Sequence, residues 1–308
     1  MSLELYQVIL LVIIGALVGI SISFVGQTGQ GVVFPLVFLI TGDIFLAIAI
    51  NVLNDLITSS SVSLLYIKNK EFKIRKDILI LIIIAIIVSL FGVYILMTTP
   101  LGSIFGWFLP LFITVLGLLF VRKGFPTKES VRKTVKNIAY RALRKKGDET
   151  KLAELEQKIN EQMDTIGDEI EGIIPSNSRV FYLLSLGFGI FMGINSGMFG
   201  ANSGLVIVLA LIILYGYPLK KGVGTALILS ILVSIATFSI YQFLGIIIKG
   251  RFYYNLEISL YLALGSIVTG LLTSNYIQKM SAKTMGRMMG FVMVLLGVVS
   301  FTFYFITY

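Results

Sequence analysis

A single carboxylate, Asp55, falls deep inside a membrane-length stretch of apolar sequence, residues 44–66. Four polar side chains share its helical face at spacings of three and four residues: Asn51, Asn54, Thr58 and Ser59. Carboxylates inside membrane spans usually serve transport, by carrying a proton or by pairing with a charged solute. Because an ionised Asp55 would repel a nearby anion, protonation of this residue could be coupled to anion transport. The structural alternative is that Asp55 accepts hydrogen bonds from exposed N–H groups of a broken helix.

Two polar, Gly-rich stretches interrupt apolar helices, GQTGQG at residues 26–31 and GANSG at residues 200–204. Unpaired backbone groups in hydrocarbon each cost several kcal/mol, so such breaks occur where they line a polar cavity or are buried in protein. A short helix should begin after each break, and we expect the two positive helix N-termini to converge near the membrane midplane and attract an anion. The predicted substrate-binding residues are Gly26, Gln27, Thr28, Gly29, Gln30, Gly31, Gly200, Ala201, Asn202, Ser203 and Gly204.

Other glycines near the breaks predict helix packing. Gly15 and Gly19, like Gly189, Gly193 and Gly197, recur every four residues and form small-xxx-small surfaces. Packing requires only small residues, and it gives no reason for the glutamines and asparagine of the breaks. We therefore favour packing for the spaced glycines and ligand binding for the breaks.

Composition indicates an integral membrane protein and excludes chemistry that depends on Cys or His. Of the 308 residues 56% are hydrophobic and 13% are charged, whereas soluble domains carry about 25% charged residues. The absence of Cys and His excludes disulfides, Cys/His metal sites and Ser-His catalysis. An aspartyl protease would need a second deeply placed aspartate. We expect no enzyme activity and no cofactor, and we expect the first apolar segment to be retained because MSLELYQ lacks a basic signal-peptide start.

Membrane helices must position these residues. Apolar stretches long enough to span about 30 Å of hydrocarbon lie at 77–98, 103–121, 257–276 and 285–307, and longer stretches with a polar stripe lie at 44–66 and 218–243. The remaining apolar sequence reads as two broken helices, 5–25 with 30–42 and 180–199 with 203–216. The second piece of each pair is too short for a comfortable crossing.

The chain also reads as a duplicated unit. Gly15, Gly19, Gly26 and Gly42 each have a glycine 174 residues later, at Gly189, Gly193, Gly200 and Gly216. Each unit holds a broken or re-entrant helix pair plus three transmembrane helices, an odd number of crossings, so the second copy should be inverted. The predicted fold is an all-α polytopic membrane protein with two inverted-topology repeats. Its parts are residues 1–121, a cytoplasmic helical hairpin at 122–178, and residues 179–308.

The distribution of basic residues predicts the orientation. If the loop 67–76 is cytoplasmic, all but two of the 25 Lys and Arg residues lie inside, and only Lys249 and Arg251 lie outside. Both termini are then extracytoplasmic and residues 122–178 are cytoplasmic, in a multi-pass plasma-membrane protein. The net charge of +9 therefore reflects topology, and we expect no nucleic-acid partner. The expected partners are a small anion and the bilayer, with a homo-oligomer left open.

The segments GALVGISISFVGQTGQGVVFPLVFLITG and GFGIFMGINSGMFGANSGLVIVLALIILYG resemble the sulfite exporter TauE/SafE family of permeases. The resemblance covers residues 8–121 and 183–305, and it implies export of sulfite, organosulfonates or related small anions. We predict a secondary transporter that works by alternating access, with proton coupling through Asp55 as a hypothesis. The alternatives are a carrier coupled to Na⁺ or another cation, with Asp55 as cation ligand, and a passive anion channel. The predicted coupling residues are Asp55, Asn51, Asn54 and Thr58.

Overall fold

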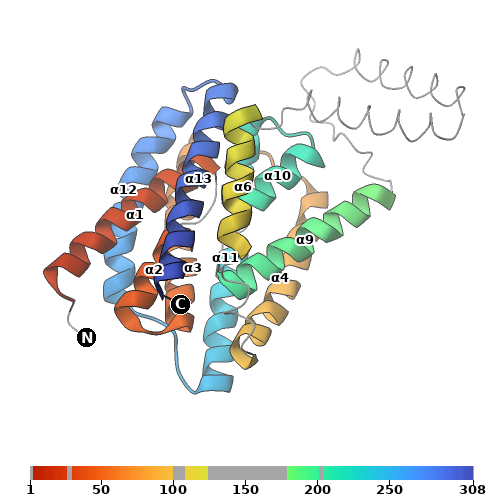
Figure 1. Cartoon of the computed structure of the whole chain (residues 1–308). Helices are drawn as coiled ribbons and strands as arrows, with labels where there is room; N and C mark the ends of the chain where they lie inside the picture. The colour runs from red at the N-terminus through yellow and green to blue at the C-terminus, as the bar shows by residue number, and fades with distance from the viewer. Residues whose placement is uncertain (1–2, 26–29, 100–107, 124–178, 201–203, 308) are drawn as a thin grey trace, which may run out of the picture.

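A computed structural model (Figure 1) describes residues 3–25, 30–99, 108–123, 179–200 and 204–307. Within these ranges the chain forms ten α-helices and no strand. The helices are α1 Leu5–Val25, α2 Gln30–Thr41, α3 Ile44–Lys68, α4 Lys76–Thr98, α6 Phe108–Lys123, α9 Arg179–Phe199, α10 Gly204–Ile213, α11 Leu219–Lys249, α12 Leu256–Ile277 and α13 Ala282–Thr307. The all-helical architecture predicted from the sequence is confirmed for these residues.

Six of the described helices, α1, α3, α4, α9, α11 and α12, are long and apolar enough to cross a membrane. The short helices α2 and α10 have 12 and 10 residues, which correspond to about 18 and 15 Å at 1.5 Å per residue. Neither can span a hydrocarbon core about 30 Å thick. The chain is therefore a multi-pass membrane protein. In it the short helix α2 follows the long helix α1, and the short helix α10 follows the long helix α9.

Helix ends match the expected spans within a few residues, except at α11. The Asp43 side chain accepts from the N–H groups of Phe45 and Leu46 and so begins α3. Helix α11 continues six residues past the predicted end at residue 243. Gly250 ends it in the left-handed conformation, with φ of +68°. Residues 244–248, LGIII, are apolar as well, so the helix extends further than predicted and ends at Lys249.

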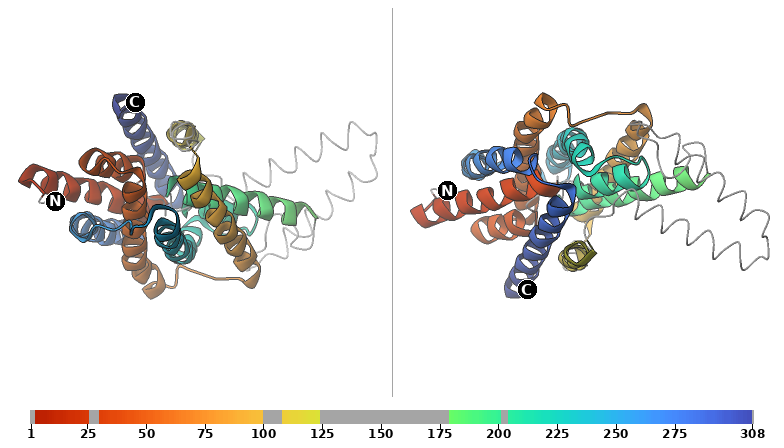
Figure 2. Two further views of the ribbon diagram at one scale, coloured as in Figure 1. Left: turned by 90° about the horizontal axis from the view of Figure 1, so that it is seen from below. Right: turned by 90° about the horizontal axis from the view of Figure 1, so that it is seen from above.

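The two halves of the chain are interlocked (Figure 2). Helix α1 packs along α12 of the second half, and α9 packs along α4 of the first half. A Cβ added at Gly15 would lie 2.2 Å from the carbonyl oxygen of Leu262, and one at Gly193 would lie 2.6 Å from that of Ala85. Both helix pairs are thus in backbone contact, and the predicted packing role of the spaced glycines is confirmed.

The contacts along these pairs also give the helix directions. Gly15 lies at Leu262, Gly19 at Ser266, and the Ser23 hydroxyl donates to the Gly270 carbonyl. The residue numbers rise together, so α1 and α12 are parallel. The pair formed by α4 and α9 behaves in the same way, with contacts that advance through Leu81–Gly189, Ala85–Gly193 and Ser89–Gly197.

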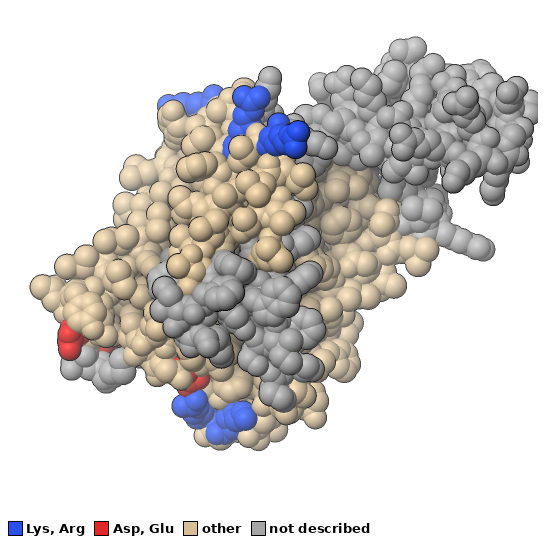
Figure 3. Space-filling model, in the orientation of Figure 1, with Lys and Arg blue, Asp and Glu red and all other residues tan. Residues whose placement is uncertain are grey.

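Helices α3 and α11 pack against each other in the opposite sense. Tyr66, near the end of α3, touches Gly224 near the start of α11. At the other end, Asp43 before α3 pairs with Arg251 after α11. The two helices are therefore antiparallel, and their midpoints lie opposite each other. Figure 3 shows Lys and Arg side chains gathered at the two ends of the molecule, with a few acidic side chains toward the lower end and a broad uncharged surface above them.

Candidate functional site

Asp55 lies at the middle of α3 and is fully buried. The four polar neighbours on its helical face, Asn51, Asn54, Thr58 and Ser59, are also 0% exposed. The sequence-predicted stripe therefore faces the protein interior along its whole length. Since buried polar groups are costly unless they find partners, the neighbouring helices must supply those partners or a ligand must.

Helix α12 supplies part of this set through Ser266. The hydroxyls of Thr58 and Ser266 are 2.7 Å apart, and the Ser266 hydroxyl lies 3.1 Å from the Asn54 Oδ1 atom, to which it donates. Thr58 and Asn54, two of the predicted coupling residues, are thus joined to the second half of the chain. Ser266 could not be predicted from the sequence, because it lies in a continuous apolar run and only its contact with α3 distinguishes it.

The end of α9 meets the same stripe. The Asn51 Nδ2 atom donates to the Gly200 carbonyl oxygen at 2.7 Å. Gly200 has a φ of +61°, and a Cβ at this position would lie 2.3 Å from the Ile48 Cγ2 atom, so glycine is favoured by both backbone conformation and space. This bond joins a predicted coupling residue, Asn51, to a predicted substrate-binding residue, Gly200.

Helix α11 also contacts the end of α9. The Tyr241 hydroxyl donates to the Gly197 carbonyl oxygen at 2.6 Å. Thr237 lies one turn from Tyr241 toward the middle of α11, and Asp55 lies one turn from Asn51 toward the middle of α3. Because α3 and α11 are antiparallel, these two residues lie at a similar depth. Thr237 is 1% exposed. We use the name central polar cluster for Asn51, Asn54, Asp55, Thr58 and Ser59 of α3, Ser234 and Thr237 of α11, and Ser266 of α12.

Several groups of the central polar cluster have no hydrogen-bond partner among the described residues. The donor-capable atoms are Asn54 Nδ2, Ser59 Oγ, Ser234 Oγ and Thr237 Oγ1. Such a group typically costs about 1–3 kcal/mol when it is buried without a partner, and native proteins contain few of them. All four are carried by α3 and α11, two helices that pack against each other.

The cluster carries no basic residue. In the described helices every Lys and Arg lies within about two turns of a helix end, and the break residues contain none. No group of three or more Asp, Glu, His or Cys residues that could hold a metal ion occurs in the described ranges. The site can therefore offer neutral donors and one carboxyl group.

Contacts between the halves close the basic end of the molecule. The Tyr217 hydroxyl donates to the Lys73 carbonyl oxygen at 2.6 Å, and the Lys73 N–H donates to the Thr225 hydroxyl at 3.0 Å. Burial raises the pKa of Tyr215 and Tyr217 to about 12. Both phenols stay protonated at neutral pH and act as donors, Tyr215 to the Asp77 carbonyl oxygen.

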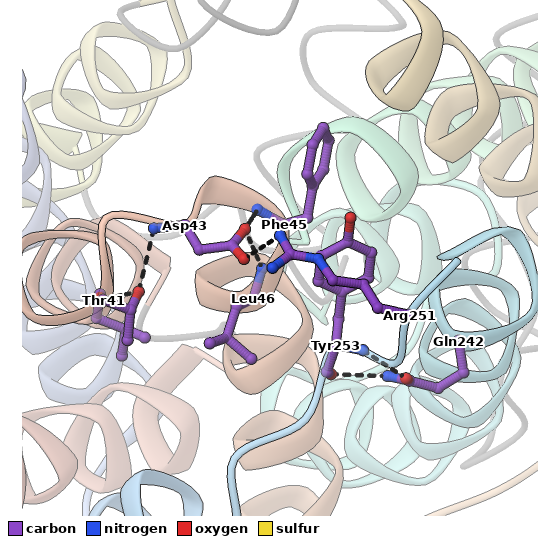
Figure 4. Close-up of polar contacts among 8 residues, drawn as sticks. Thr41, Asp43, Phe45, Leu46, Gln242, Arg251 and Tyr253 are labelled. Carbon is purple, nitrogen blue, oxygen red and sulfur yellow. Dashed lines mark hydrogen bonds and ion pairs between the residues drawn. The ribbon is translucent and has the colours of Figure 1, made fainter. Parts of the chain in front are cut away.

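A second set of contacts closes the opposite end (Figure 4). Asp43, which caps α3, forms an ion pair with Arg251. The Arg251 guanidinium also lies 4.8 Å from the centre of the Tyr253 ring. Gln242 holds the Tyr253 backbone through two hydrogen bonds of 2.9 and 3.0 Å. The central polar cluster thus lies between two ends at which the halves are joined.

The structure places only some of the predicted substrate-binding residues. Gly26, Gln27, Thr28, Gly29, Ala201, Asn202 and Ser203 lie outside the described residues. Gln30 and Gly31 begin α2, and Gly204 begins α10, so a short helix follows each break as expected.

The described flanks of the two breaks lie at different depths along α3. Gly200 lies beside Asn51, whereas the Ser23 carbonyl oxygen, before the first break, accepts from the Tyr66 hydroxyl at 3.3 Å. Asn51 and Tyr66 are separated by about 22 Å along the helix axis. That the N-termini of the two short helices converge stays a prediction.

Comparison with known proteins gives one match. The family model described as sulfite exporter TauE/SafE matches residues 11–300. No curated protein and no solved structure matches the chain. The matched region includes both breaks, the whole of α3 and α11, and every residue of the central polar cluster. The chain therefore belongs to the sulfite exporter TauE/SafE family of membrane transporters.

Proposed function

We propose that this protein is a secondary transporter that exports a small anion, such as sulfite or an organosulfonate, across the plasma membrane by alternating access. The family description supports export of a sulfite-like anion. The observation that carries the proposal is the central polar cluster, which combines buried donors that have no partner among the described residues with a buried carboxyl group. A small oxyanion would satisfy these donors.

Alternating access fits a chain of two inverted-topology repeats. In this reading α3 and α11 are equivalent helices of the two copies, and their antiparallel packing supports inversion. The same correspondence pairs α1 with α9 and α4 with α12. Contact of α1 with α12 then has its counterpart in the contact of α9 with α4. The copies would correspond to residues 1–121 and 179–308, with the hairpin 122–178 between them.

The proposed orientation places the basic end in the cytoplasm. Lys68, Lys70, Lys73, Lys220 and Lys221 lie at the end that Tyr217 and Thr225 close. Basic residues are enriched on the cytoplasmic side of membrane proteins. Both termini and the ion pair of Asp43 with Arg251 would then face outward. Closure at both ends is the arrangement expected of an occluded intermediate between inward-open and outward-open states.

We assign anion contacts to the breaks at residues 26–31 and 200–204 as well as to the cluster. Helix N-termini and glycine backbone can present N–H groups to the anion without a fixed positive charge. Asn51 links the two parts of the site through its bond to Gly200. Movement of the end of α9 would therefore displace Asn51 and change the surroundings of Asp55, which lies one turn away on the same helix.

Asp55 is the proposed coupling group. An ionised carboxylate about 4 Å from an anion would oppose it by about 4 kcal/mol at an effective dielectric constant of 20. Proton binding to Asp55 removes this repulsion, so anion binding and proton binding should favour each other. Asn51, Asn54 and Thr58 would fix the position of the helix face that carries the carboxyl group.

A cation-coupled carrier is the second candidate, and one observation favours it. The Asn51 Oδ1 atom is buried one turn from Asp55 and has no partner among the described residues. Together with the carboxylate it could ligate Na⁺. An absolute Na⁺ requirement for anion flux would support this candidate, whereas flux driven by a pH gradient in Na⁺-free buffer supports proton coupling.

The test is sulfite and methanesulfonate flux in proteoliposomes. We expect flux that depends on the imposed pH gradient, and we expect Asp55→Asn to remove that dependence. Ser61→Ala is the matched control, because Ser61 lies on the same helix but donates to its own Ile57 carbonyl oxygen. Absence of flux for every anion tested, in protein that retains its thermal stability, would overturn the proposal.

A further inference from the structure

We infer that the transported anion binds between α3 and α11, on hydroxyl and amide donors from both helices, and that this site accepts singly charged oxyanions and rejects doubly charged ones. The inference rests on the proposed function and adds the place and the charge class of the substrate. Two of the proposed ligand-binding side chains, Ser234 and Thr237, come from α11, and neither was among the binding or coupling residues predicted from the sequence.

The donors have the number and chemistry that an oxyanion needs. Asn54 Nδ2, Ser59 Oγ, Ser234 Oγ and Thr237 Oγ1 lack partners within the described part of the chain. Their side chains are between 0% and 2% exposed. A sulfonate or hydrogen sulfite presents three oxygen atoms, each of which can accept hydrogen bonds. Filling the site with such an anion satisfies all four groups.

Two hydrogen bonds set the level of the donor-bearing segments of α3 and α11 relative to each other. Asn51 of α3 and Tyr241 of α11 donate to carbonyl groups one turn apart at the end of α9, Gly200 and Gly197. Moving inward along α3 leads to Asn54 and then to Ser59. Because α11 is antiparallel, moving inward from Tyr241 leads to Thr237 and then Ser234. The donor-bearing faces of both helices thus begin at the same helix end and run in the same direction.

The charge balance of the site sets the class of anion. Helices α1, α2, α11 and α12 pack against α3. Their described charged residues lie near the helix ends, and the members of the central polar cluster that they supply, Ser234, Thr237 and Ser266, are neutral. The charged groups Asp43, Arg251 and Lys68 lie at the helix ends. With a proton on Asp55, the site balances one negative charge with oriented dipoles. A second negative charge has no cation to pair with.

The experiment measures binding of two anions that keep their charge over the whole pH range. Methanesulfonate is singly charged and sulfate is doubly charged between about pH 5.5 and about pH 8, because both are conjugate bases of acids much stronger than carboxylic acids. Binding to purified protein in lipid nanodiscs is measured by calorimetry. We expect the dissociation constant of methanesulfonate to be at least about tenfold lower than that of sulfate. Its affinity should fall as the pH rises, and Asp55→Asn should remove this pH dependence.

Side-chain variants test the location. Ser59→Ala and Thr237→Val each remove one donor, and each should weaken methanesulfonate binding about tenfold, while Ser61→Ala should leave it unchanged. Thermal stability of every variant is measured alongside, so that loss of binding is interpreted only in folded protein. Thr237→Val removes the hydroxyl but keeps the shape of the side chain, so a change in its affinity measures the contribution of the hydroxyl to binding.

The outcomes separate this inference from the proposed function. Equal binding of sulfate and methanesulfonate, or unchanged affinity in both folded donor variants, overturns the inference while anion flux in proteoliposomes still supports transport. Absence of any anion flux overturns the proposed function itself. Selective methanesulfonate binding that weakens in Ser59→Ala and Thr237→Val supports both.

Discussion

Replacing Gly19 by alanine should separate α1 from α12. An added Cβ would lie 2.2 Å from the Ser266 carbonyl oxygen and 2.3 Å from the Thr269 hydroxyl. An ordinary contact requires at least 3.4 Å, so the helices would have to move apart by more than 1 Å. Overpacking of this kind costs about 1–3 kcal/mol. The Thr269 hydroxyl bond to the Ala16 carbonyl, 2.8 Å long, would weaken too and adds about 1 kcal/mol.

The expected total is a loss of about 2–4 kcal/mol, the sum of these two contributions. In detergent this should lower the apparent melting temperature by roughly 5–10 °C at a few degrees per kcal/mol. Gly187→Ala is the matched control, because no atom lies within 4 Å of the Cβ position at Gly187. Gly193→Ala, on the equivalent contact of α9 with α4, should behave like Gly19→Ala. A Gly19→Ala protein as stable as wild type would refute the backbone contact between α1 and α12.

Four further predictions concern the ends of the molecule and the end of α9. Arg251→Ala should open the end opposite the basic one, and a cysteine placed at Ala49 in this cysteine-free chain should then react faster with an impermeant thiol reagent. Tyr217→Phe should destabilise the protein by about 1 kcal/mol through the lost bond to Lys73. Protein stability should fall between about pH 10 and pH 12, because burial holds the pKa of Tyr217 at about 12 in the folded protein and it is about 10 in the unfolded chain. Gly200→Ala should cost about 2–4 kcal/mol, from left-handed strain of about 1–2 kcal/mol and contact with Ile48.

The controls for these variants come from the same structural settings. Tyr254→Phe alters a half-exposed tyrosine and should leave stability unchanged. Gly42 has a φ of +67° but no atom near its Cβ position, so Gly42→Ala should show the backbone strain without the clash. Equal destabilisation by Gly42→Ala and Gly200→Ala would contradict the clash with Ile48. Unchanged thiol reactivity at position 49 in Arg251→Ala would contradict the closing role of the ion pair.

Local patterns made much of this fold predictable. Spans such as α4 and α12 follow from uninterrupted apolar sequence, and the inward face of α3 follows from the spacing of Asn51, Asp55 and Thr58. The Gly15–Gly19 spacing predicts a close helix contact. These inferences succeed because each depends on residues within a few helical turns, where periodicity reports directly on which face is buried.

The partners of those faces could not be predicted, because they depend on helices far apart in sequence. Ser266 joins the central polar cluster only because α12 packs beside α3. Glycine spacing in α1 predicts a contact but cannot identify α12 as the helix contacted. Gly200 was predicted as a ligand-binding residue from its neighbours in the break, whereas its bond to Asn51 depends on how the end of α9 meets α3. Each of these contacts depends on packing between helices that are distant in sequence, which no local periodicity predicts.

The interlocked halves constrain the movements by which the proposed alternating access could occur. Backbone contact along α1–α12 and along α4–α9 leaves little freedom for the two halves of the chain to slide past each other as rigid bodies. Each tight pair contains one helix from each half. Helix α3 packs beside α12, and α11 packs beside α4. The groups α1–α3–α12 and α4–α9–α11 therefore each draw on both halves, and they are joined by the packing of α3 against α11. The central polar cluster lies where these groups meet, between α3 and α11. Rocking of one group against the other would expose the cluster alternately at the two ends and leave both glycine contacts intact.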